Sequence, residues 1–170
     1  WPYKQHKTSR NIKKLPYHDD LKSFGACFGV SAGYERPMWF ALDGEKAEYE
    51  YSYNYQNWYP SVEFETNNTL TNVGLYDLSP FSKFEIKSKK AHEDLQRICT
   101  SNIKQEPGKC TYTHMLNKDG GIEADLTVVC IDQNHFRIIS SAATRERDKF
   151  HIKKHLSEGA ELIDVTDNYC

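Results

Sequence analysis

Long apolar runs are missing from the 170-residue sequence, and none approaches the roughly 20 residues that a membrane-spanning helix needs. No hydrophobic segment follows the charges of the first seven residues, so we expect neither a membrane span nor a secretion signal. A basic excess is also missing, because 22 Lys and Arg stand against 24 Asp and Glu, for a formal net charge of -2. This balance argues against duplex nucleic acid as the main partner of the whole chain.

Cysteine pairs with the spacing of metal ligands are absent too. The cysteines are odd in number, widely spaced and never in a Cys-x-x-Cys pair: Cys27, Cys99, Cys110, Cys130 and Cys170. The pattern encodes neither a disulfide framework nor a zinc knuckle, so we expect no metal and reduced thiols. Reduced thiols favour the cytoplasm of a bacterium or the mitochondrial matrix of a eukaryote. We interpret the sequon at Asn67-Asn68-Thr69 as a chance match.

An initiator methionine is missing as well, and we expect the chain to be a piece of a longer protein. The basic first fourteen residues predict an extended arm, and a short helix is expected from Pro16 to Phe24, with Gly25 as its stop. The irregular, bulky run Tyr34–Phe40 predicts a packed loop. Alternating tyrosines from Tyr49 to Tyr55 predict a strand. With no basic residue interleaved, that strand favours packing against another domain over stacking on nucleic-acid bases.

From residue 61 onward the periodicity is regular. It predicts helices at 61–72, 89–101 and 144–157, and strands at 81–87, 109–117, 122–131, 136–139 and 160–165, with a tight hairpin at Gly120-Gly121. The order β-α-β-β-β-α-β after residue 80 predicts an α+β fold. We expect a mostly antiparallel sheet with both helices on one face, a variant of the ferredoxin-like split β-α-β pattern, compact over residues 81–166.

Several candidate sites do not survive the spacing of their residues. His151 and His155 are four apart on a predicted helix, but no third metal ligand is nearby, and solvated helix faces are the favoured interpretation. Cys110 and His114 would be separated by roughly 13 Å of strand rise, too far for a nucleophile and its base. No glycine cluster has the context of a phosphate loop. We therefore expect no nucleotide motif within the sequence.

Asp125 is the one carboxylate that draws attention. It stands at the entrance to the apolar strand 122–131, where a carboxylate is disfavoured unless it is exposed, partnered or functional. From composition alone, a solvent-exposed strand end and a functional group are equally good interpretations.

Two motifs around these residues resemble a known family. Gly74–Phe81 and the hairpin Tyr112–Val128 resemble the folate-binding fold of the glycine-cleavage aminomethyltransferase, with its Gly-Leu-Phe-Asp-Val-Ser turn and Gly-Gly-Ile-x-x-Asp-Leu hairpin. Gly25–Gly29 and Gly33–Phe40 look like the segment that joins the flavin and folate halves of dimethylglycine and sarcosine dehydrogenases. The plain aminomethyltransferase lacks that segment. The resemblance covers nearly the whole chain.

The resemblance implies roles for individual residues. Asp125 falls on the family's catalytic carboxylate, Tyr112 on an aromatic that lines the folate cavity, and Phe81 on a position near the pterin. The family's first acidic hairpin position is Ala124 here, Ser79-Pro80-Phe81 replaces Ser-His-Met, and an Asn after the third strand is replaced around Ser140-Ser141, which makes Ser141 a further folate-binding candidate.

The resemblance also implies a division of labour. Residues 1–60 would connect a flavin half to the folate half, and residues 61–170 would begin the aminomethyltransferase-like domain. The implied function is part of an FAD-dependent dehydrogenase that oxidises a small methylated amine and passes the one-carbon unit to tetrahydrofolate. FAD and the rest of the folate half would lie in missing parts of the same protein, so the isolated chain is expected to be inactive. A freestanding aminomethyltransferase and a non-catalytic regulatory subunit are the alternatives.

Overall fold

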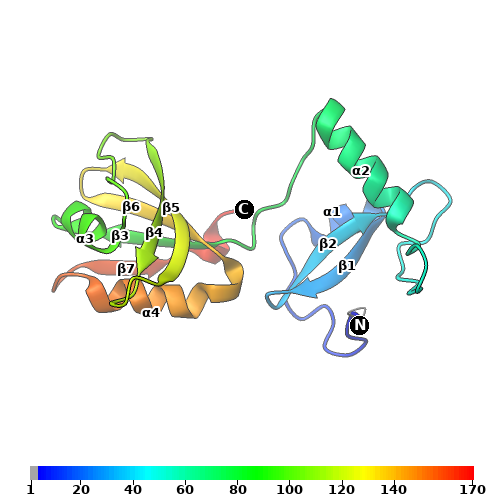
Figure 1. The fold of residues 1–170 in the computed structure, drawn as a ribbon, viewed down its shortest axis with the longest axis horizontal. Coiled ribbons are helices and arrows are strands. Elements are labelled where there is room, and N and C mark those ends of the chain that lie inside the picture. The colour runs from blue at the N-terminus through cyan, green and yellow to red at the C-terminus, as the bar shows by residue number, and fades with distance from the viewer. Residues whose placement is uncertain (1–3) are drawn as a thin grey trace. The chain divides into compact units, whose positions relative to one another are not determined.

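The structure, a computed structural model, describes residues 4–170 as two compact units that divide after Leu78 (Figure 1). The first unit contains α1 (His18–Ser23), β1 (Ala26–Ser31), β2 (Tyr34–Phe40) and α2 (Tyr59–Thr71). The second contains β3 (Ser82–Lys87), α3 (Ala91–Ile98), β4 (Cys110–Leu116), β5 (Ile122–Asp132), β6 (His135–Ser140), α4 (Arg145–His155) and β7 (Glu161–Asp164), with short 3-10 helices at Ala142–Thr144 and Thr166–Asn168.

A β-hairpin, β1 with β2, organises the first unit, and the packed loop expected at Tyr34–Phe40 is wrong. The hairpin turns at Ala32 and Gly33, which have φ angles of 52° and 81°. Two positive φ angles are typical of a type I′ turn, whose twist suits a tight hairpin. The ladder is irregular because its register shifts after Cys27, opposite the part of β2 that contains Pro37. This irregularity conceals the period of two in the sequence.

The basic arm lies against this hairpin through a buried glutamate. Glu35 is only 2% exposed, and Arg10 donates to both of its carboxylate oxygens, from Nε at 2.7 Å and from Nη2 at 2.6 Å. The backbone N–H of Asn11 adds a third bond at 2.7 Å. The Arg10 guanidinium holds the pKa of Glu35 below its usual value, although burial opposes this shift.

The tyrosine run does not form the expected strand. In the structure, the run from Tyr49 to Tyr55 is irregular. The rings of Tyr49 and Tyr51 stack at 5.6 Å, and each meets Trp58 edge-on. Tyr53 and Tyr55 remain 99% and 80% exposed. The alternation therefore reflects a local aromatic cluster in which Tyr49 and Tyr51 pack on Trp58, and not a strand.

The second unit confirms the α+β prediction. Its sheet has the order β4-β5-β6-β3-β7, and every neighbouring pair is antiparallel. Alternate strand residues and the inner faces of both helices form one core: Phe84, Ile86, Ala91, Leu95, Cys99, Ile103, Met115, Ala124, Leu126, Val128, Cys130, Phe136, Ile138 and Ile152. Helices α3 and α4 therefore cover the same face of the sheet (Figure 1). Neither lies on the other face, which the C-terminal segment reaches where the Tyr169 ring centroid is 3.9 Å from Cζ of Arg137 in β6.

Helix α3 is shorter than the expected 89–101. It ends at Ile98 because Cys99 takes an extended conformation and forms a β-bridge with Met115 of β4. The N–H of Thr100 then donates to the carbonyl of His114 at 2.9 Å. The segment after α3 thus continues along the outer edge of β4.

Candidate functional site

The sheet register gathers the four predicted site residues at one end of the second unit. Ser82, Ser140 and Leu126 are neighbours across β3, β6 and β5, and all three are buried. One residue closer to this end of the sheet lie Phe81, just before β3, Ser141, just after β6, and Asp125 in β5. Because side chains alternate along a strand, Asp125 faces away from buried Leu126 and hence away from α3 and α4.

Asp125 and Tyr112 contact each other on the face of the sheet that α3 and α4 leave open. The Tyr112 hydroxyl donates to Oδ2 of Asp125 at 3.3 Å, and Tyr112 lies two residues along β4 from His114, the cross-strand partner of Asp125. Among the described residues, Tyr112 is the one side chain that donates a hydrogen bond to this carboxylate. Partial desolvation and the negative charge of Asp125 raise the pKa of Tyr112 above its usual value. The phenol therefore stays protonated and keeps donating.

Because both groups are exposed, a ligand can reach the Tyr112–Asp125 pair. Asp125 is exposed, and Tyr112 is 61% exposed. An ionised carboxylate has about four acceptor positions, so a second donor can be bound beside the phenol. The arrangement can accept a proton from a bound group or stabilise a positive charge.

Phe81 and Ser141 lie at the same end of the sheet as Asp125, and their hydrogen bonds differ from each other. Phe81 is 38% exposed, and its carbonyl accepts a hydrogen bond from Nζ of Lys83 at 3.0 Å. The Ser141 hydroxyl accepts from the N–H of Ala143 at 3.2 Å and so caps the following 3-10 helix. Capping occupies an acceptor position of Ser141 and leaves its O–H as the group that can donate to a ligand.

Lys83 is a site residue that the sequence prediction missed. It is 8% exposed at the second position of β3, and its ammonium donates to the carbonyls of Ser79 and Phe81, both at 3.0 Å. These bonds fix the turn that presents Phe81. Lys83 alternates with Phe84 and Ile86, which is the ordinary pattern of a strand covered on one face, so no sequence signal marks it.

His114 is the second residue that the sequence prediction did not assign to this site. Its ring lies edge-on to Tyr112, with 5.4 Å between centroids, and it is paired with Asp125 in the β4–β5 ladder. From the sequence, His114 enters only as a possible partner for Cys110. The hairpin register, which pairs positions 114 and 125, is the signal that would have found it.

Clusters of metal-ligating side chains are absent from the part of the chain that the structure describes. In the span 4–170, no group of three or more His, Cys, Asp or Glu side chains is arranged to hold a metal ion. No helix in the same span has the length and apolar character needed to cross a bilayer. The candidate site is therefore built from a carboxylate, a phenol and neighbouring aromatic surface.

Comparison with known proteins identifies related chains. The chain is 36% identical over 167 residues to 4-methylaminobutanoate oxidase (formaldehyde-forming) of Paenarthrobacter nicotinovorans, which covers 98% of this chain and 20% of that protein. It is 32% identical over 142 residues to the mitochondrial dimethylglycine dehydrogenase of Rattus norvegicus, covering 82% of this chain and 16% of that protein. The chain thus spans only a small part of the relatives it matches.

A solved structure supports the fold. The glycine cleavage system aminomethyltransferase T from Bartonella henselae superposes with a TM-score of 0.74 at 22% identity, over 91% of this chain and 38% of that one. The model of the GCVT N-terminal domain family matches residues 17–170. The resemblance inferred from the two sequence motifs is confirmed: this chain belongs to the GCVT N-terminal domain family.

Proposed function

We propose that the chain is the folate-side part of an FAD-dependent oxidoreductase that acts on a small N-methyl amine and transfers the one-carbon unit to tetrahydrofolate. The observation that carries the proposal is the hydrogen-bonded Tyr112–Asp125 pair, on the sheet face that α3 and α4 leave open. The relatedness to dimethylglycine dehydrogenase supports it. The division into a connecting segment, residues 1–60, and a folate-binding part, residues 61–170, belongs to the same proposal.

The residues present fit a flat, nitrogen-rich ligand. Tyr112 and Phe81 offer partly exposed aromatic surface, and Asp125 offers an exposed acceptor. Tetrahydrofolate, when bound, supplies the amine that takes up the one-carbon unit. Asp125 accepts the proton that this amine loses, and its charge stabilises cationic states. The Tyr112 hydroxyl orients the carboxylate through Oδ2, and Ser141 offers a hydroxyl donor.

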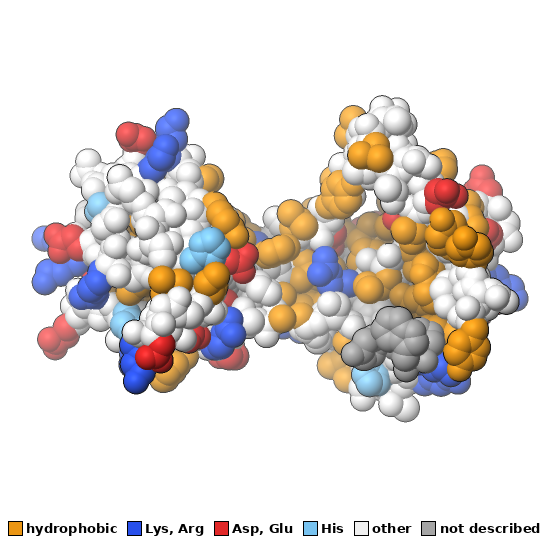
Figure 2. Space-filling view, in the orientation of Figure 1, with side chains coloured by type: hydrophobic (Ala, Val, Ile, Leu, Met, Phe, Trp, Pro, Cys, Tyr) orange, Lys and Arg blue, Asp and Glu red, His pale blue; other side chains and the backbone are white. Residues whose placement is uncertain are grey.

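The proposal places the remaining walls of the site, and the FAD, in other parts of the same longer protein. Apolar side chains exposed on and after α2 support such partners, among them Phe64 at 58%, Leu70 at 78% and Leu75 at 99% (Figure 2). Ligand sites usually bury most of their ligand, whereas Tyr112 remains largely open in this chain. We accordingly expect the isolated chain to be inactive. Reduced cysteines and the mitochondrial relative favour a bacterial cytoplasm or a mitochondrial matrix.

Asp125→Asn in the longer protein tests the proposal. The amide keeps the size of the side chain but removes the charge and the proton acceptor, so transfer to tetrahydrofolate should slow by on the order of 10² to 10⁴. Flavin reduction by the amine should barely change, and the one-carbon unit should leave as formaldehyde. The assay pairs the flavin reduction rate with the yield of methylenetetrahydrofolate. Equal loss of both rates would give Asp125 a structural role, and an unchanged folate product would remove it from the mechanism.

Release of formaldehyde without capture is a second candidate function. Its support is the relative at 36% identity, which is named as formaldehyde-forming. The unsubstituted protein distinguishes the two. Capture predicts that added tetrahydrofolate lowers the formaldehyde yield, whereas simple release predicts the same yield with and without it.

A further inference from the structure

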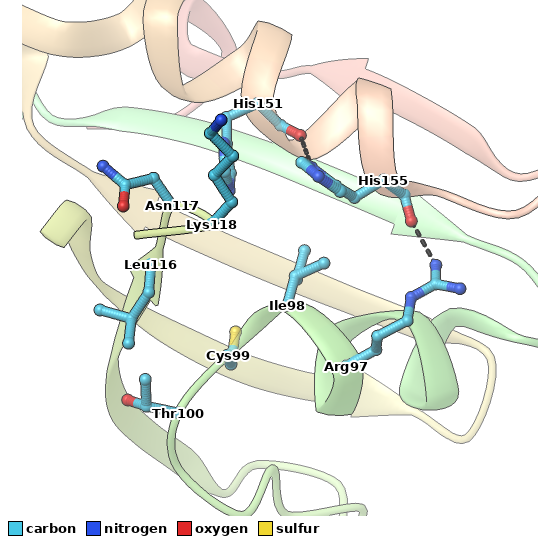
Figure 3. A pocket seen from close by; sticks show the side chains of 9 residues that line it. All are labelled: Arg97, Ile98, Cys99, Thr100, Leu116, Asn117, Lys118, His151 and His155. Atoms are coloured by element: carbon cyan, nitrogen blue, oxygen red, sulfur yellow. Dashed lines mark hydrogen bonds between the residues drawn. The ribbon is translucent and has the colours of Figure 1, made fainter. Parts of the chain in front are cut away.

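A concave site, separate from the Tyr112–Asp125 pair, lies on the helix-covered side of the second unit. It has a volume of about 340 Å³ and lies where the end of α3, the β4–β5 hairpin and the last turns of α4 meet (Figure 3). Ile98 and Leu116 provide apolar surface, and Arg97 and Lys118 lie on different sides of it (Figure 3). The volume is within the range of small-molecule sites.

The lining of this pocket has positive charge and no carboxylate. The ammonium of Lys118 has no hydrogen bond or ion pair with any residue of the described chain. Arg97 donates from Nη2 to Oδ1 of Asp94 at 2.8 Å and to the carbonyl of His155, which leaves Nε and Nη1 available. Because Asp94 offsets part of the Arg97 charge, Lys118 supplies the uncompensated cation.

Two histidines add to the polar lining, which also includes Thr100 and Asn117. His151 and His155 pack with 4.6 Å between ring centroids. Nδ1 of His155 lies 2.8 Å from the carbonyl of His151. A carbonyl only accepts, so Nδ1 carries the proton and Nε2 remains for another partner. Within residues 4–170, the His151 ring makes no hydrogen bond.

The surroundings of the His151 ring determine how it titrates. Burial, assisted by His155, holds the pKa of His151 below its usual value, and Lys154 acts in the same direction. Glu123 of the hairpin and Asp148 of α4 oppose the shift. Arg97 and Lys118 are the charged groups from the other two elements that line the same pocket. A bound anion would reverse this balance and raise the pKa of His151.

We propose that this pocket binds a small organic oxyanion whose charged group is held by Lys118 and whose apolar part rests on Ile98 and Leu116, with Arg97 on the opposite side adding positive potential (Figure 3). A charge-assisted bond from Lys118 orients the oxyanion. A metal ion is a poorer occupant, because only two imidazoles are offered and both cations repel it.

Titration of the isotopically labelled 170-residue chain with phenyl phosphate and benzoate, followed by NMR, tests this proposal. We expect saturable shifts of amide signals at residues 97–100 and 116–118, with a dissociation constant of about 1 mM. Inorganic phosphate should bind about threefold to tenfold more weakly than phenyl phosphate because it lacks the apolar part. Imidazole C–H signals should report a higher pKa for His151 when the anion is bound.

Matched variants separate the pocket from general electrostatics. Lys118→Gln, in an exposed turn, should weaken binding about tenfold, the effect of losing one charge-assisted contact. Lys104→Gln removes an exposed lysine elsewhere and should leave the dissociation constant unchanged. Equal weakening by both variants would overturn the proposal. So would equal shifts with the cation benzylamine, no saturation up to about 20-fold above the expected constant, or a response to Zn²⁺ alone.

Discussion

A single buried carboxylate, Asp94 of α3, joins the two helices of the second unit. It is 1% exposed, and Ser157, just after α4, donates to it from its N–H at 2.8 Å and from its hydroxyl at 2.7 Å. Arg97 adds a third bond at 2.8 Å but is 61% exposed, so solvent screens its charge and it contributes little. The stabilising effect therefore comes mainly from the two bonds with Ser157.

Asp94→Asn should lower the stability of the second unit by about 2 kcal/mol. Asparagine has one acceptor oxygen instead of two, so one donor of Ser157 loses its partner, and the remaining bond is no longer charge-assisted. Bonds to a charged group contribute about 1.5–3 kcal/mol each, compared with about 1 kcal/mol for neutral ones. Glu93→Gln, at an exposed position of the same helix, is the control and should change stability by less than about 0.5 kcal/mol.

Native-state hydrogen exchange of the β3 and β6 amides measures this effect, because these strands should open only on global unfolding of the unit. Tryptophan fluorescence provides an internal reference, since Trp1, Trp39 and Trp58 all precede residue 79. The Asp94 variant should shift the exchange but leave the tryptophan unfolding transition in place. A change below about 0.5 kcal/mol at β3 would refute the assigned role of Ser157. An equal shift of the hydrogen exchange and of the tryptophan transition would refute the expectation that Asp94→Asn destabilises the second unit alone.

Two further predictions concern the turn of the first unit and the acid sensitivity of the second. Ala32→Asn should raise the stability reported by tryptophan fluorescence in urea by about 0.5–1 kcal/mol, because Ala32 has a φ of 52° that asparagine tolerates better; Gly33→Ala, at 81°, should lower it, and the opposite order would contradict the turn type. Although burial opposes the shift, hydrogen bonds from Arg145 and Thr166 lower the pKa of Asp164 from 3.8 to about 2. A depressed folded-state pKa stabilises the fold above pH 3.8, by about 2 kcal/mol, and this stabilisation is lost as the pH falls toward 2. Asp164→Asn should therefore flatten the fall in the urea midpoint of β3 NMR signals between pH 5 and pH 2, and an unchanged slope would exclude Asp164 as its source.

The sequence predicts the second unit well and the first unit poorly, for physical reasons. In β5, alternate residues from Ala124 to Cys130 are buried, so the period of two follows directly from burial on one face. In the first unit, Ala32-Gly33 is a weak hairpin signal compared with Asn-Gly, and the bulge at Met38, next to Pro37, interrupts the alternation. The tyrosines alternate without a strand because their rings pack on one another.

The candidate site shows a similar division. The residues themselves, Asp125 and Tyr112, follow from the family resemblance, and the hairpin register then brings them together. The contribution of Lys83 could not be predicted, because it depends on backbone carbonyls of a turn. From the sequence, solvated helix faces are the favoured interpretation of His151 and His155. Their pocket arises from contacts among α3, α4 and the hairpin that no local pattern encodes.

The segment that follows α3 has a consequence for association between molecules. An unpaired edge strand offers a row of backbone donors and acceptors on which another chain can add a strand and begin to aggregate. The bridge between Cys99 and Met115 and the bond from Thr100 to His114 already occupy part of that row on β4. The N–H of Ser101 also donates to the Thr113 hydroxyl at 3.0 Å, which covers the same edge. The chain thus protects the β4 edge, next to the Tyr112–Asp125 pair, from intermolecular strand addition.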